Sequence, residues 1–151
     1  MADFTVSTTI DNFMQSQTAA AARTAIGAAG GGGTTLSGTT SNNTPTEIFV
    51  DGVADSRMTI ATNTTWMFSA MVAARSATES AGYKSEGVIK NDGDATSLVG
   101  TAVKTVLAEE DSAWDITVEA DDANDALVFK VTGDSADSVV WEVTVNKTEA
   151  S

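Results

Sequence analysis

The sequence predicts a mainly β protein: an antiparallel β-sandwich of jelly-roll type, preceded by an extended N-terminal arm that carries one short helix. Three observations lead to this prediction. From Thr46 onward, apolar and polar residues alternate with a period of two, which is typical of half-buried strands. Turn-forming residues, such as those at Asp51-Gly52 and Asn91–Asp94, separate the alternating runs. The earlier residues are mostly small and polar, so we divide the chain into an arm, residues 1–45, and a β knob, residues 46–151.

The arm contains one segment that favours a helix, Thr18–Ile26. It includes four consecutive alanines, Thr18 or Ser16 can cap its start, and Gly27 can end it. Gly30–Gly33 and a run rich in Ser and Thr then lead to Pro45, and two interpretations stay open: a disordered linker, or an extended arm that becomes ordered on a partner. On the second interpretation, the partner-binding residues of the arm are Phe4, Phe13, Met14, Ile26, Thr34, Thr35 and Leu36.

We expect eight short strands in the knob. The alternation is clearest in the last four, where Trp114, Phe129 and Trp141 each share a face with aliphatic neighbours. No helical pattern interrupts the runs, and this spacing indicates an antiparallel sandwich. The expected strands are Thr46–Val50, Arg57–Ala61, Thr65–Ala77, Ala81–Asn91, Ala102–Ala108, Trp114–Ala120, Ala126–Thr132 and Val139–Lys147.

The composition excludes several classes of catalytic site. The chain has no cysteine and no histidine, so thiolate nucleophiles, disulfides and Cys-based zinc sites are ruled out. The commonest general base is missing too, which makes Ser–His and Cys–His catalysis impossible. We therefore expect a protein that is not an enzyme and that binds no cofactor.

The net charge of −13 restricts the partners. It comes from 21 acidic and 8 basic residues, and such a surface repels phosphate backbones and anionic membranes. The negative charge has two possible explanations. It keeps the protein soluble, or alternatively it docks the protein onto a basic partner. No segment has the roughly 20 apolar residues that span a bilayer, and the N-terminus lacks the pattern of a signal peptide. We expect a protein that is made and kept in a cytoplasm, or assembled there, with neither nucleic acid nor membrane as a partner.

Three acidic clusters suggest a calcium site, because calcium takes six to eight oxygen ligands. They lack the central glycine and terminal glutamate of an EF-hand loop, so we interpret them as solvated turns and expect no metal. Pairs of acids are too common in this chain to indicate a glycosidase. The clusters are Asp92 with Asp94, Glu109–Asp111, and Asp121-Asp122 with Asp125.

The three tryptophans allow two interpretations. Trp66, Trp114 and Trp141 could form a stacking platform for sugars, or they could belong to the core. Each lies in or beside an alternating strand, in register with aliphatic neighbours. We therefore expect all three in the core.

Two stretches resemble bacteriophage virion proteins. Phe13–Gly27 (FMQSQTAAAARTAIG) is similar to an AAAARxAIG segment that recurs in phage tail-fibre and related appendage proteins. A second series resembles a β-module of tail-fibre, head-fibre and decoration proteins, and together the two cover most of the chain. The second series comprises Pro45–Gly52, Thr65-Trp66, Ala81–Lys90, Ser112–Asp115 and Val140-Trp141.

This resemblance implies a β-sandwich, a homotrimer and no enzymatic activity. Typical fibres of the family are much longer and carry a tail-binding domain and a shaft, whereas this chain has 151 residues. We therefore expect a capsid decoration (cement) protein on the outer surface of the virion, which binds the major capsid protein and stabilises the shell through its N-terminal arm. The alternative is a receptor- or glycan-binding module of a short tail fibre or baseplate.

Overall fold

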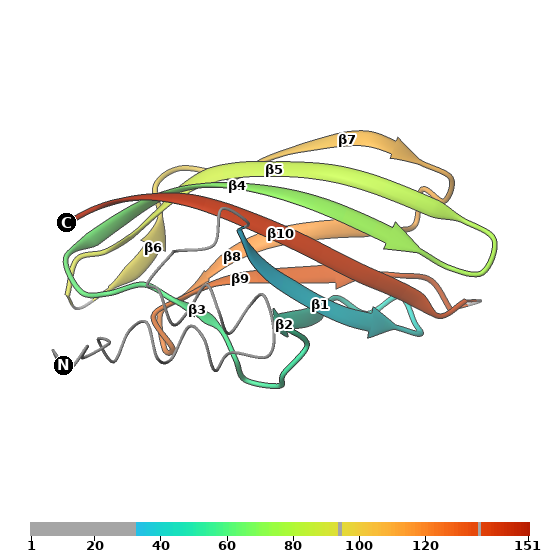
Figure 1. Cartoon of the computed structure of the whole chain (residues 1–151), viewed down its shortest axis with the longest axis horizontal. Coiled ribbons are helices and arrows are strands. Elements are labelled where there is room, and N and C mark those ends of the chain that lie inside the picture. The colour runs from blue at the N-terminus through green and yellow to red at the C-terminus, as the bar shows by residue number, and fades with distance from the viewer. Residues whose placement is uncertain (1–32, 94, 136) are drawn as a thin grey trace, which may run out of the picture. The chain divides into compact units, whose positions relative to one another are not determined.

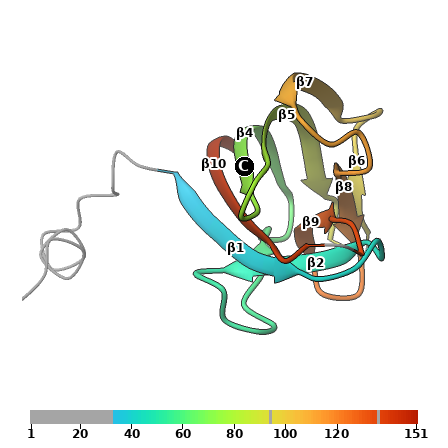
Figure 2. The same cartoon turned by 90° about the vertical axis from the view of Figure 1, so that its right-hand side faces the viewer.

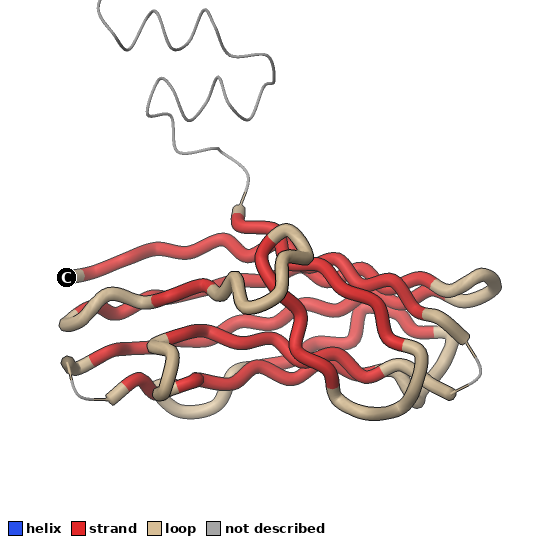
Figure 3. The backbone as a smooth tube through the Cα atoms, turned by 90° about the horizontal axis from the view of Figure 1, so that it is seen from below, coloured by secondary structure: helices blue, strands red, loops and turns tan. Residues whose placement is uncertain are grey.

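The computed structural model describes residues 33–93, 95–135 and 137–151, and these residues form strands joined by turns (Figures 1 and 3). The strands form a ten-stranded antiparallel sheet, so the predicted mainly β class is confirmed. The helix expected at Thr18–Ile26 lies outside the described residues. The strands are β1 (Thr34–Thr40), β2 (Thr46–Val50), β3 (Met58–Thr59), β4 (Thr64–Arg75), β5 (Ser80–Asn91), β6 (Thr96–Leu98), β7 (Val103–Glu109), β8 (Asp115–Asp121), β9 (Ala126–Thr132) and β10 (Val139–Ala150).

The sheet curls on itself into a half-barrel, which Figure 2 shows from one end. Its strand order is β3-β9-β2-β1-β10-β4-β5-β6, and β7 and β8 pair with β5 and β9 respectively. Because β2 pairs with both β1 and β9, the two halves of the expected sandwich are parts of one continuous sheet. The inner side of the curl encloses the core.

Alternate residues of the long strands point into that core. Trp141 of β10 lies beside Trp114, with ring centroids 5.9 Å apart, and stacks on Tyr83 at 6.4 Å. Phe68 and Phe129 make an edge-to-face contact at 6.3 Å, a favourable arrangement for two aromatic rings. The faces predicted for the last strands are therefore buried as expected: Ile116, Leu127, Val131, Val139, Val143 and Val145 line the core.

The first strand corrects the expected boundary at residue 45. β1 pairs with β10 along its whole length and also with β2, so the β region begins at Thr34. Only Leu36 in this strand has a large apolar side chain, and it is buried in the core. Gly38 is required because a Cβ at this position would lie 2.6 Å from Cγ2 of Ile48.

Polar contacts join the two ends of the curl. The backbone N–H of Thr96 donates to Asp122 at 2.6 Å, and its hydroxyl donates to Asp125 at 2.7 Å. Further along, Lys104 of β7 pairs with Asp115 of β8. The described part of the chain includes no helix that is both long and apolar enough to cross a membrane.

Candidate functional site

The side of β10, β4 and β5 that points away from the core, called the outer face here, carries exposed apolar side chains. Met67 and Met71 project from β4, and Met67 is 59% exposed. Val140 of β10 is 57% exposed and lies opposite Arg75 of β4. Exposed apolar side chains therefore recur at intervals along the outer face, which makes it a candidate interaction surface.

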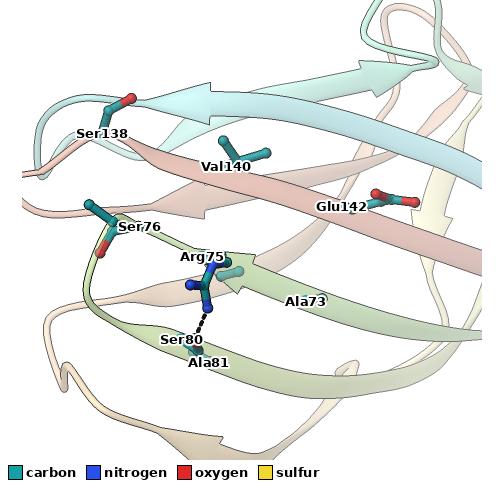
Figure 4. A pocket seen from close by; sticks show the side chains of 10 residues that line it. Ala73, Arg75, Ser76, Ser80, Ala81, Ser138, Val140 and Glu142 are labelled. Carbon is teal, nitrogen blue, oxygen red and sulfur yellow. Dashed lines mark hydrogen bonds between the residues drawn. The ribbon is translucent and has the colours of Figure 1, made fainter.

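A hollow of about 680 Å³ lies at one end of the outer face (Figure 4). The small side chain of Ala73 lines it, and Val140 and Glu142 lie along one side. Arg75 donates a hydrogen bond to Ser80 Oγ at 3.3 Å within the hollow. Its lining is largely apolar and carries one charge of each sign, from Arg75 and Glu142.

β7 is the second exposed apolar element. All seven of its residues are exposed, and Val103 is 62% exposed. Val106 and Leu107, which follow on the same strand, are also exposed. Among the described strands, β7 pairs with β5 alone, so its other edge is open.

The predicted acidic clusters serve the fold. Asp121 accepts hydrogen bonds from the backbone N–H groups of Ala123 and Asn124 and from the Asn124 amide. These bonds lower the pKa of the Asp121 carboxyl, with a smaller contribution from the charge of Arg57. Together with the contacts of Asp122 and Asp125 to β6, they hold the turn between β8 and β9.

The described residues of the other two predicted clusters also have internal partners. Glu109 accepts a hydrogen bond from the buried Tyr83 hydroxyl at 3.1 Å, and burial together with this bond raises the pKa of Tyr83. Glu110 accepts from the backbone of Ser80 at 2.7 Å, and Asp111 accepts from the backbone N–H of Ala113 at 2.8 Å. Asp92 pairs with Lys90, whereas Asp94 lies outside the described residues.

One acidic cluster was not predicted. Single carboxylate oxygens of Glu79, Asp111 and Asp134 lie within 4.8 Å of one another, although the three residues come from three different turns. Partial burial raises the pKa of Glu79, and the negative charges of Asp111 and Asp134 raise it further. These carboxylates could contribute ligands to a cation, but one oxygen from each supplies only three of the six to eight that calcium takes. Nothing in the spacing of these residues along the sequence could have indicated that they meet.

The tryptophans are core residues, as predicted. Trp66, Trp114 and Trp141 are all at least 97% buried, so none presents a ring for sugar stacking. Nε1 of Trp66 donates to Glu149 at 2.8 Å, and the Lys147 ammonium lies 3.6 Å from the centre of the Trp66 ring. The indole N–H of Trp114 is buried and has no hydrogen-bond acceptor in the described part of the chain.

The residues of the arm that were predicted to bind a partner fall into two groups. Phe4, Phe13, Met14 and Ile26 lie outside the described residues. Thr34, Thr35 and Leu36 belong to β1, where they lie opposite β10 residues of the same chain. Because Leu36 is buried, its assignment as an arm contact is wrong, and the backbone of this segment pairs within its own sheet.

No protein-family model matches the chain, and no curated protein matches it.

Proposed function

We propose that this chain is a non-enzymatic structural protein of a bacteriophage particle that decorates the capsid shell. The observation that carries the proposal is the exposed apolar surface formed by the outer face and β7, which is suited to docking on another protein. The resemblance of Phe13–Gly27 and of the β region to phage virion segments supplies the biological setting.

The placement of the polar and aromatic residues supports the same proposal. The acids that could perform chemistry are held in turns and ion pairs, as for Asp121, Asp122 and Asp125. The tryptophans that could bind a sugar are buried. What the described surface offers is an apolar face on an acidic molecule, a combination that favours specific docking and disfavours unspecific clumping.

The copy number in purified particles tests the proposal. Quantitative mass spectrometry of phage heads should find on the order of hundreds of copies per particle, because decoration follows the repeat of the shell lattice. About a dozen copies would contradict decoration and would assign the protein to an appendage, such as a short fibre or baseplate. Absence from particles would contradict both assignments.

A matched pair of variants tests the surface. Met71→Glu places a charge on the outer face, and it should reduce occupancy on heads prepared without the protein, because a buried charge in a contact is costly. Val53→Glu is the control, since Val53 is also apolar and exposed but lies in the loop between β2 and β3. Equal occupancy for both variants would show that the outer face does not contact the shell.

A further inference from the structure

β7 presents an edge that is open to strand addition. In the described structure it pairs with β5 on one side only, and every side chain is exposed. Edge strands of monomeric proteins are commonly protected by proline, by several charges or by a covering loop, because open edges pair with other chains. β7 has no proline, and its centre, Val106-Leu107-Ala108, is apolar.

The sequence of this strand is complementary to itself. Residues 104–109 read Lys-Thr-Val-Leu-Ala-Glu, with opposite charges at the two ends of an apolar centre. When two such segments run antiparallel, directly opposite residues lie on the same face and interact. A two-fold axis between Val106 and Leu107 then places Lys104 opposite Glu109 of the second copy, Thr105 opposite Ala108, and Val106 opposite Leu107.

The register of β7 on β5 is compatible with this arrangement. The ladder shifts between Gly82 and Tyr83, so that Leu107 is an extra residue on β7. This β-bulge at Leu107 lies at the proposed two-fold axis. The symmetry therefore places the bulges of the two copies opposite each other. Toward the start of β7, Lys104 lies opposite Ser85, so this end of the strand follows a regular antiparallel ladder.

We propose that β7 pairs antiparallel with β7 of a second copy across a two-fold axis, so that the sheet continues from one copy into the next. Opposite charges at both ends of the pairing offset the general repulsion between two molecules of net charge −13. The apolar centre excludes water from the contact. This interface does not depend on capsid decoration, and it gives a dimer where the phage resemblance implies a trimer.

Charge exchange tests the pairing in the full chain. By sedimentation equilibrium, the protein should have twice the monomer mass of 15.5 kDa. Lys104→Glu should weaken self-association at least tenfold, because it places two acids opposite each other. The double variant K104E/E109K should restore association, since it exchanges the charges and leaves the net charge unchanged.

A control variant separates the pairing from general charge effects. Lys130→Glu changes the net charge by the same amount and also breaks an exposed ion pair, with Glu119, as K104E does with Asp115. It should leave the dimer intact. A monomeric or trimeric mass for the unaltered chain, or a double variant that stays as weak as K104E, overturns the proposal. Thermal melting of each variant confirms folding, and Tyr83 keeps the Trp114 carbonyl as a second acceptor when Glu109 is replaced.

Cysteine cross-linking tests the register independently. The chain has no cysteine, so introduced thiols are the only ones present. The double variant T105C/A108C places opposite thiols within disulfide reach and should form a covalent dimer on mild oxidation. The single variant T105C should not, because Thr105 of one copy lies three residues, about 10 Å, along the strand from Thr105 of the other. Failure of the first variant to cross-link, or equal cross-linking of both, overturns the proposed pairing.

Discussion

Replacement of Trp141 by alanine measures how strongly the core depends on its central indole. The side chain is fully buried, contacts the rings of Trp114 and Tyr83, and donates from Nε1 to Thr40 Oγ1 at 2.9 Å. Truncation of a buried aromatic side chain costs about 3–5 kcal/mol. The lost hydrogen bond contributes about 1 kcal/mol of this and each ring contact about 0.5–1.5 kcal/mol.

A loss of this size is a large part of the roughly 5–15 kcal/mol that stabilises a domain. The melting temperature, followed by circular dichroism, should fall by about 10–25 °C. Val140→Ala is the matched control, because Val140 is the neighbouring residue on β10 but is 57% exposed on the outer face. It should shift the melting temperature by a few degrees at most. Similar shifts for the two variants would refute the assignment of the two faces of β10.

Three further predictions concern a glycine, an acid and the domain boundary. Gly133→Ala should destabilise the protein by about 1–3 kcal/mol in chemical denaturation, because the added Cβ would lie 2.3 Å from Thr40 Oγ1, the acceptor of a buried indole N–H. Glu79→Gln should raise the melting temperature at pH 7, because the pKa of Glu79 is raised in the folded protein and its stabilising contribution is lost as the pH rises above 4.5. The difference from the unaltered protein should vanish in melts below about pH 4, where both side chains are neutral. A fragment of residues 34–151 should give a cooperative melt, whereas residues 46–151 should not, because the shorter fragment lacks β1 between β2 and β10.

Much of the sheet could be predicted because burial on one face imposes alternation on the sequence. β2 and β9 have the bounds that the pattern predicts, and the other predicted strands differ by a few residues at their ends. β1 was missed because its sequence, TTLSGTT, offers a single large apolar side chain and contains a glycine. Its place in the sheet depends on pairing with β10, and a partner about a hundred residues away leaves no local signal. β6 has only three residues, too few for a period to be seen.

The candidate site was less predictable than the core. Burial of the tryptophans follows from their register with aliphatic neighbours, and the structure confirms it. The meeting of Glu79, Asp111 and Asp134 depends on three turns that only the folded sheet brings together. The exposure of β7 is not encoded in its own composition either, because the alternating segment that forms it reads as a half-buried strand. Whether a strand has an open edge depends on the order of the strands in the sheet, and not on the sequence of that strand.

The two proposals make a joint prediction about binding to the shell. If β7 pairs with β7 of a second copy, β10, β4 and β5 of both copies belong to one sheet, and their outer faces lie on one continuous surface. Docking of one copy then raises the effective concentration of the other, so a dimer should bind undecorated heads more tightly than a monomer. Lys104→Glu should therefore lower head binding at limiting protein concentration, although it leaves Met67, Met71 and Val140 unchanged. Lys130→Glu, which alters the net charge equally, should bind as the unaltered protein does. Weaker head binding with an intact dimer would place Lys104 in the shell contact itself, whereas a monomer that binds heads undiminished would show that decoration does not require the β7 pairing.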